Sequence, residues 1–95
     1  MNDRVYEYNS LIYEAEQKGG VYVDFPYDVR EEFGRGRVKV RATFDGEVYE
    51  GSIVNMGLTN DDGSVRYIIG IRKDIRLRIG KQPGDTVHVT IRERE

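Results

Sequence analysis

The chain contains no cysteine, a single histidine and only two prolines among its 95 residues. Without cysteine it can form neither disulfide bonds nor thiolate metal sites, and thiol catalysis is excluded. One histidine with no cysteine beside it does not make a zinc site. No apolar run reaches the length of a signal sequence or of a membrane span. We therefore expect a cytoplasmic protein with no membrane association, no metal and no cofactor.

Charge of both signs is abundant but unevenly spread. Charged residues make up 34% of the chain, with a net charge of -2. Residues 1–34 hold three basic and eight acidic residues, whereas residues 35–95 hold twelve basic and nine acidic ones. The acidic total therefore conceals a basic surface in the second part. The length and the 38% hydrophobic content predict one folded domain over residues 1–95.

Alternation of apolar and polar residues predicts six β-strands. They cover residues 11–17 (with a start as early as Arg4), 21–25, 37–44, 47–56, 65–71 and 86–92. Lys18-Gly19-Gly20 and Asp45-Gly46 predict hairpin turns, because glycine adopts positive φ without strain. Residues 57–64 predict a longer loop. Its Asn60-Asp61-Asp62-Gly63 run lacks the spaced carboxylates of a calcium loop, which favours a plain hairpin.

Two segments, residues 26–33 and 72–79, change to helical spacing. Each has apolar residues four apart and then a glycine that ends the helix: Val29, Phe33 and Gly34 in the first, and Ile75, Ile79 and Gly80 in the second. Each helix has about two turns and is too short to be stable alone in water. Both helices are therefore expected to dock on the sheet.

The two helical segments align at a constant offset of 46 residues. The matched pairs are Val23 and Ile69, Phe25 and Ile71, Asp28 and Asp74, Val29 and Ile75, Arg30 and Arg76, Phe33 and Ile79, and Gly34 and Gly80. The following strands also match, at residues 38–40 and 87–89, after a three-residue extension. A β-β-α-β unit used twice about an approximate twofold axis explains this better than chance similarity of two amphipathic turns. The predicted fold is a six-stranded closed or double-split β-barrel, which leaves no long exposed edge.

The second copy resembles a motif known from swapped-hairpin transcription factors. Residues 70–87, which include Gly70, Asp74, Gly80 and Gly84-Asp85, look like the strand–helix–Gly-Asp–strand pattern of AbrB-type proteins. Residues 25–30, with Pro26, resemble the entry to the same pattern. AbrB-type barrels are assembled from two chains. The resemblance implies that this chain carries both halves, so that a monomer is able to close the barrel.

A wider resemblance covers nearly the whole chain. It is to a family of bacterial and archaeal proteins, number 1905 in the series of domains of unknown function. The segments that carry it are residues 25–29, 36–40, 45–46, Tyr49, 51–52, 79–81 and 84–89. The resemblance implies a small double-split β-barrel with two short helices. It brings no established activity and no catalytic residues.

Candidate catalytic groups are few. His88, between Val87 and Val89, falls on the polar face of the last strand. It is either a lone general base or an exposed residue without a role, and the second interpretation is favoured because no partner motif accompanies it. No serine has a Gly-x-Ser-x-Gly context, and no phosphate-binding loop motif is present. We predict that the protein is not an enzyme and has no catalytic residues.

Basic residues form the strongest candidate binding site. Arg35, Arg37, Lys39 and Arg41 alternate, which predicts that they project from one face of one strand. A second basic group follows at Arg72, Lys73 and Arg76. These seven residues are the candidate contacts for nucleic acid or another anion. The alternative is a solvated outer face that keeps the domain soluble.

The favoured function is a non-enzymatic binding or interaction module. Its partner is an unidentified protein or a small ligand, held in a groove between the two helices. Seven tyrosines fall mainly on the predicted strands, where a cluster around one opening would line a pocket, although a structural role is the safer interpretation. Nucleic acid bound through the basic residues is the second candidate.

Overall fold

The computed structural model describes residues 4–15 and 20–94. These residues form seven strands and two helices, so the prediction of a mainly β fold with two short helices is confirmed. The elements are β1 (Val5–Leu11), β2 (Tyr13–Glu14), β3 (Val21–Phe25), α1 (Val29–Phe33), β4 (Val38–Phe44), β5 (Glu47–Thr59), β6 (Val65–Gly70), α2 (Lys73–Ile79) and β7 (Thr86–Glu93).

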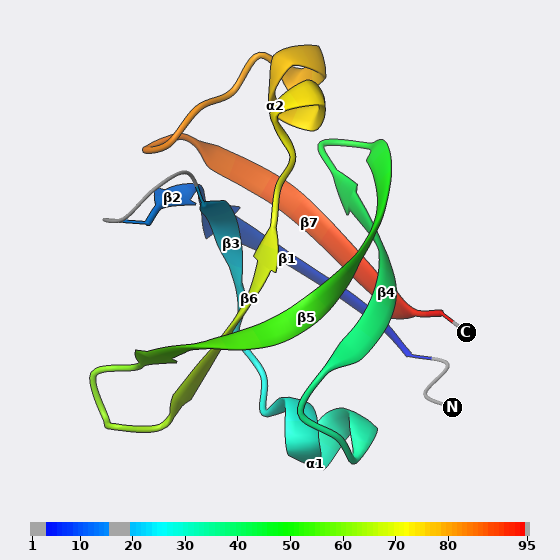
Figure 1. Cartoon of the computed structure of the whole chain (residues 1–95). Coiled ribbons are helices and arrows are strands. Elements are labelled where there is room, and N and C mark those ends of the chain that lie inside the picture. Colours follow the sequence, from blue (N-terminus) through cyan, green and yellow to red (C-terminus); the bar gives the residue numbers. More distant parts are fainter. Residues whose placement is uncertain (1–3, 16–19, 95) are drawn as a thin grey trace.

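All seven strands join one antiparallel sheet in the order β1-β7-β4-β5-β6-β3-β2. The sheet curls into a half-barrel, with α1 and α2 at opposite ends (Figure 1). Full closure into a barrel goes beyond this arrangement and stays a prediction. No helix in the described part of the chain is long and apolar enough to cross a membrane.

The strand count is seven rather than the predicted six because the first strand is broken at Ile12. There the N–H of Ile12 donates to Asp85 O at 2.8 Å, and Ile12 O accepts from the N–H of Gly84 at 2.9 Å. β1 pairs with β7 and β2 with β3, whereas β5 pairs with both β4 and β6 as one strand. Residues 16–19, which hold most of the predicted Lys18-Gly19-Gly20 turn, lie outside the described residues.

The register between β3 and β6 has the symmetry that the sequence repeat predicts. Val23 lies opposite Ile69, its match in the repeat. In the neighbouring pair, Tyr22 lies opposite Gly70. The repeat matches Tyr22 with Ile68 and Gly70 with Asp24, and Ile68 does lie opposite Asp24. A twofold axis through the Val23–Ile69 pair therefore relates the two strands.

β4 and β7 have the same property once the three-residue extension is included. Ala42 lies opposite Ile91, and these two residues are equivalent at an offset of 49. At the same offset Val40 matches Val89 and Glu93 matches Phe44. Val40 lies opposite Glu93, and Val89 likewise lies opposite Phe44. The two halves thus pair around one approximate axis that passes through both strand pairs.

The core lies along this axis and extends under both helices. Val29 of α1 and Ile75 of α2, which are equivalent, are both almost fully buried. Each helix ends at a glycine in the left-handed conformation, Gly34 at φ 74° and Gly80 at φ 69°. Only glycine adopts this conformation without strain, which is why the two glycines recur at the same place in the repeat.

Candidate functional site

The seven predicted basic residues do not form one surface. Arg35 and Arg37 lie between α1 and β4, and Lys39 and Arg41 lie on β4. Arg72, Lys73 and Arg76 lie at the start of α2 and within it, at the other end of the sheet (Figure 1). The prediction that the first four occupy one strand is wrong for two of them. β4 begins at Val38, because the chain leaves α1 through a bend at residues 34–36. Only Lys39 and Arg41 project from β4.

β7 and the residue that follows it add two cations that sequence reasoning missed. Arg92 lies directly opposite Arg41. The backbone N–H of Arg94 donates to Lys39 O at 2.9 Å, and its Nε donates to Val40 O at 3.2 Å. We call Lys39, Arg41, Arg92 and Arg94 the β4–β7 basic face. Alternation in the last strand already placed Arg92 on its polar side, but the pairing of β4 with β7 is not a local signal.

Two carboxylates lie close to these cations. Glu50 Oε2 lies 3.0 Å from Arg41 Nη2, and this hydrogen bond lowers the pKa of Glu50. Glu93 Oε2 lies 3.8 Å from Arg35 Nη2. The Arg41–Glu50 pair is exposed and contributes little to stability, whereas Glu93 is buried and its partner Arg35 lies outside this face. Like charges directly opposite each other, as in Arg41 and Arg92, are unfavourable unless an anion lies between them.

The basic residues of α2 serve local contacts. The guanidinium of Arg72 donates to both carboxylate oxygens of Asp74 at 3.1 Å and lies 5.8 Å from the ring of Tyr49. The Nε of Arg76 is buried and has no hydrogen-bond partner among the described residues. Arg72 therefore helps to fix the start of the helix, and this group is separate from the β4–β7 basic face.

His88 lies on the outer face of β7, as predicted. Its Nε2 is 2.7 Å from Glu7 Oε2, and its backbone N–H donates to Asp45 Oδ1 at 2.9 Å. Asp45 Oδ2 is also 2.7 Å from Lys81 Nζ. His88 is half exposed and does not line the pocket described below. Within residues 4–15 and 20–94, no group of three or more His, Cys, Asp or Glu side chains is placed to hold a metal.

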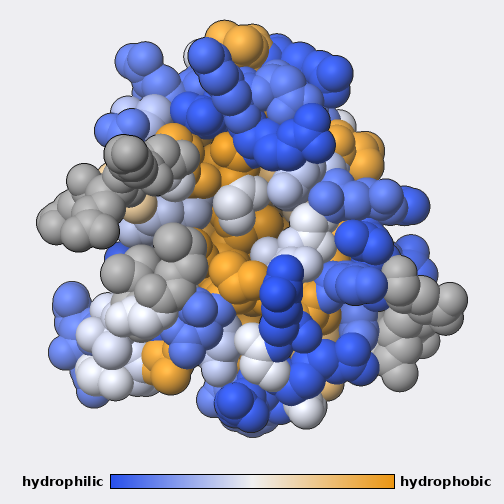
Figure 2. Space-filling view, in the orientation of Figure 1, coloured by the Kyte–Doolittle hydropathy of each residue, from blue (hydrophilic) through white to orange (hydrophobic). Residues whose placement is uncertain are grey.

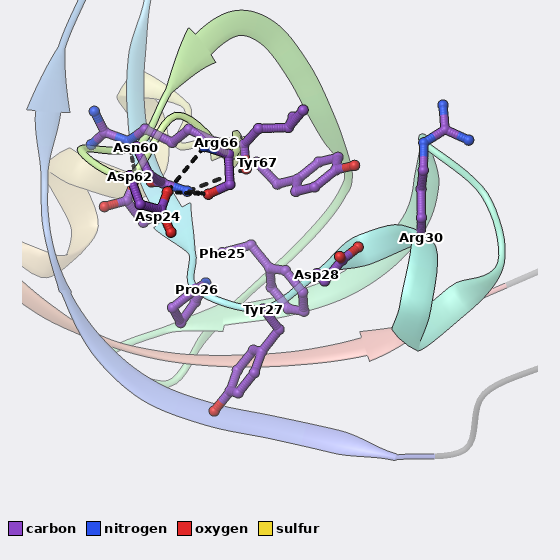
Figure 3. A pocket seen from close by; sticks show the side chains of 12 residues that line it. Asp24, Phe25, Pro26, Tyr27, Asp28, Arg30, Asn60, Asp62, Arg66 and Tyr67 are labelled. Atoms are coloured by element: carbon purple, nitrogen blue, oxygen red, sulfur yellow. Dashed lines mark hydrogen bonds and ion pairs between the residues drawn. The ribbon is translucent and has the colours of Figure 1, made fainter.

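A pocket of about 560 Å³ lies beside α1, between the segment that follows β3 and the β5–β6 hairpin. We call it the α1-end pocket (Figure 3). It forms where β3 stops and β6 continues. In the β3–β6 register, Pro26 would face Arg66, and proline has no N–H to donate to the ladder. The lining consists of Asp24, Phe25, Pro26, Tyr27, Asp28, Arg30, Asn60, Asp62, Ser64, Val65, Arg66 and Tyr67.

Aromatic rings gather on one side of this pocket. The ring of Phe25 lies 5.4 Å from that of Tyr27 and 5.3 Å from that of Tyr6 (centroid to centroid), and Phe33 lies 5.5 Å from Tyr6. Tyr27 is 37% exposed, so its ring is accessible from solvent. Figure 2 shows hydrophobic residues reaching the surface in the middle of one face, between hydrophilic residues at both ends. Tyr27 and Tyr67 line the pocket, whereas the ring of Tyr6 is buried in the core, so the tyrosines serve packing as well as the pocket wall.

An ion pair forms the opposite wall. Arg66 Nε donates to Asp24 Oδ1 at 2.6 Å, and this hydrogen bond raises the pKa of Arg66. The guanidinium of Arg66 also lies 4.6 Å from the ring centroid of Tyr13 and 5.6 Å from that of Tyr22. These contacts hold the Arg66 side chain in one position and give the pocket a rigid wall.

A buried tyrosine supports the strand behind this wall. Tyr8 Oη donates to the backbone oxygen of Asp24 at 2.7 Å. Burial raises the pKa of Tyr8 well above its usual value, and the nearby Asp24 carboxylate adds to the shift. Tyr8 is therefore a neutral hydrogen-bond donor at neutral pH. It joins β1 to β3 where the two strands adjoin.

None of the pocket residues was among the seven predicted contacts. The lining comes from residues 24–30 and 60–67, and only the pairing of β3 with β6 brings these segments together. The pocket lies beside α1 alone. The predicted groove between the two helices is therefore not its location, because α2 occupies the far end of the sheet (Figure 1).

Comparison with known proteins agrees with this architecture and adds no activity to it. No curated protein matches the chain. A family model described as "Domain of unknown function (DUF1905)" matches residues 9–91, which include all seven strands fully or in part, both helices and every residue of the α1-end pocket. The chain therefore belongs to this family, DUF1905.

Proposed function

We propose that the domain is a non-enzymatic binding module that holds a small ligand in the α1-end pocket. The supporting observation is a pocket of about 560 Å³ with the accessible ring of Tyr27 and a fixed ion pair in its walls. This volume falls within the range of small-molecule sites, roughly 300–1,000 Å³. Apolar surface with a few oriented polar groups is the usual composition of such sites.

Departure from the internal symmetry supports the same assignment. At the α1 end the repeat places Phe25, Tyr27 and Phe33, whereas the equivalent positions at the α2 end hold Ile71, Lys73 and Ile79. Phe25 and Ile71 are equally buried, and Phe33 and Ile79 both pack against the core, so packing alone does not require aromatic rings at the α1 end. Aromatic rings at one end alone are what a binding site at that end requires.

The contacts of the carboxylates in the pocket support binding without catalysis. Asp24 is paired with Arg66, Asp28 accepts from the N–H of Glu31, and Asp62 accepts from Ser64. A general acid or base needs a side chain that is able to reach the reacting atom. The carboxylates in this pocket are instead committed to contacts within the protein.

A fragment screen tests the proposal. Amide chemical shifts of the ¹⁵N-labelled protein would be recorded with a diverse fragment library, and hits are expected to shift residues 24–30 and 60–67. Val65 is 43% exposed in the lining, so Val65→Trp should fill the pocket and abolish these shifts. Val48→Trp, at an exposed position outside the lining, is the control and should bind normally. Hits that survive Val65→Trp, or no hits at all, would contradict the proposal.

Nucleic acid is the second candidate ligand, at a different surface. Its support is the β4–β7 basic face, where Arg41 and Arg92 lie opposite each other in spite of their like charge. Phosphates placed between such cations would relieve the repulsion. The face bears threonines beside its cations, at Thr43 and Thr90, and no aromatic ring for base stacking. The fitting partner is therefore a sugar–phosphate backbone bound without sequence preference.

Salt dependence tests this candidate. Binding to duplex DNA should weaken steeply between about 50 and 200 mM salt, because counterions are released from the DNA. Arg92→Gln should reduce both the affinity and the salt slope, whereas Lys73→Gln, at the other end of the sheet, should change neither. Absence of binding at low salt would eliminate this function.

We also propose that the half-barrel is closed. Tyr8 Oη donates to Asp24 O at 2.7 Å, and Asp24 N donates to Ser10 Oγ at 3.2 Å. Side chains of β1 therefore bond to the backbone of β3, in place of a backbone ladder between the two strands. A closed barrel built from both copies of the repeat would be stable as a monomer. A cytoplasmic location and kinship with AbrB-type barrels, through the β6–α2–Gly84-Asp85–β7 sequence, belong to the same proposal.

A further inference from the structure

Most polar groups of the α1-end pocket already make hydrogen bonds or ion pairs within the protein. Asp24, Asp28 and Asp62 hold Arg66, the start of α1 and Ser64, respectively. The side-chain amide of Asn60 donates to Ser64 Oγ at 3.0 Å and to Val65 O at 3.2 Å. These groups fix the shape of the pocket and have little capacity left for a ligand.

Arg30 is different. It lies in the first turn of α1 and lines the pocket, and its guanidinium makes no ion pair or hydrogen bond within the described residues. Figure 3 shows it on the side away from the Asp24–Arg66 pair, with the rings of Phe25, Tyr27 and Tyr67 between the two. A Cβ at Gly36 would lie only 3.1 Å from Arg30 Nη2, so the glycine leaves the guanidinium room in this position.

The rest of the accessible lining is apolar or phenolic. Pro26, Tyr27 and Val65 are exposed in the lining, and the hydroxyls of Tyr27 and Tyr67 make no hydrogen bond within the described residues. A planar apolar body is able to lie against these side chains while an acidic group reaches Arg30. The three carboxylates of the lining repel any anion, and they repel one with several negative charges more strongly than one with a single charge.

We infer that the α1-end pocket binds small organic acids that carry one anionic group on a planar apolar body. The anion is held by Arg30, and the body packs on Tyr27 and its neighbours. This inference rests on the proposed function, because it names the ligand class for the same pocket. A guanidinium donates two parallel hydrogen bonds to a carboxylate, which favours acids over neutral compounds of the same shape.

Three probes that share a phenyl ring on a short chain separate the effect of charge from that of the ring: phenylacetate, benzyl alcohol and phenethylamine. Each would be titrated into the ¹⁵N-labelled full chain, with amide shifts of residues 24–30 and 60–67 as the readout. We expect phenylacetate to bind about tenfold more tightly than benzyl alcohol, and phenethylamine to bind no better than the alcohol.

Arg30→Gln tests the role of the guanidinium. It should lower the affinity for phenylacetate about tenfold and leave that for benzyl alcohol unchanged. Arg37→Gln is the matched control, since Arg37 is an exposed arginine outside the lining and should affect neither probe. An unchanged amide spectrum outside the pocket would show that both variants fold.

The possible outcomes separate the two proposals. Equal affinity for all three probes, or a loss in Arg30→Gln that is the same for acid and alcohol, would overturn the acid specificity while pocket binding stands. If no probe shifts the pocket residues but library fragments do, the ligand class is wrong and the binding function survives. If neither probes nor library fragments bind there, both proposals fail.

Discussion

Single residues decide how closely strands and rings approach each other, and Gly51 is the clearest case. A Cβ at Gly51 would lie 2.5 Å from Cε2 and 3.1 Å from the hydroxyl oxygen of Tyr49. The Tyr49 ring is itself packed, with its centroid 6.1 Å from that of Phe44. Glycine at this position therefore allows the ring to lie flat along β5 and to cover the core beneath α2.

Gly51→Ala is expected to lower the free energy of unfolding by about 1–3 kcal/mol, because the new methyl group displaces the Tyr49 ring. In the Tyr49→Ala background the same substitution should cost much less, since the clash is gone. Urea denaturation of the four proteins gives the coupling energy. An equal cost of Gly51→Ala in both backgrounds would show that the ring does not occupy this position.

Elements depend on contacts at their ends, and α1 is too short to persist without them. Asp28 precedes α1, and its Oδ1 accepts from the N–H of Glu31 at 3.2 Å. Asp28→Ala should destabilise the domain by about 1 kcal/mol, whereas Asp28→Asn, which keeps an acceptor oxygen, should cost less. Thermal unfolding measures both. Because α1 carries Arg30, the alanine variant should also bind phenylacetate more weakly, and unchanged binding would separate the helix start from the pocket.

The β4–β5 hairpin shows how charge fixes a turn. Asp45 and Gly46 both have positive φ, at 49° and 89°, which suits the tight turn predicted from Asp45-Gly46. Burial raises the pKa of Asp45, but the hydrogen bonds from Lys81 and from the His88 N–H outweigh it and hold the pKa below its usual value. A carboxylate with a lowered pKa stabilises the fold above its unfolded pKa, and this contribution is lost as pH falls through the folded value.

Asp45→Asn removes the charge and keeps a residue that tolerates positive φ. At pH 7 it should lower the free energy of unfolding by less than about 1 kcal/mol, since the pair with Lys81 is partly exposed. The difference between the two proteins should shrink as pH falls below the unfolded pKa of about 4 and should be lost once pH passes the lower pKa of the folded state. Urea denaturation at several pH values measures this difference. A difference that stays constant or grows toward low pH would contradict the role given to the charge.

At the scale of the whole molecule, the twofold relation makes the β7–β1 pair equivalent to the β4–β5 hairpin. Val5 pairs with Arg92, so the start of β1 and the end of β7 lie side by side (Figure 1), at the place that the Asp45-Gly46 turn occupies in the other half. A circular permutant that begins at Gly46, ends at Asp45 and joins the old termini through a short Gly-rich linker should fold. Its unfolding should remain cooperative, within about 2 kcal/mol of wild type. Noncooperative unfolding would argue against the equivalence.

Most strands and both helix ends could be predicted from local sequence patterns, whereas the pocket depends on which strands pair. Alternation placed β4 and β7 within a residue or so of their observed ends, and Gly34 and Gly80 marked both helix ends because each needs a left-handed backbone. The break at Ile12 has no local signal, since it is produced by residues 84 and 85. The α1-end pocket and the contribution of Arg92 were not predictable for the same reason. Both depend on which strands become neighbours.

The central claim is that both halves pair around one axis and so leave the pocket at the α1 end. Cross-strand nuclear Overhauser effects in the ¹³C,¹⁵N-labelled protein test it most directly. The account predicts contacts between backbone protons of Val23 and Ile69 and between those of Ala42 and Ile91, with neighbouring contacts in the symmetric register. Absence of either contact, or a register shifted by one or more residues, would contradict it.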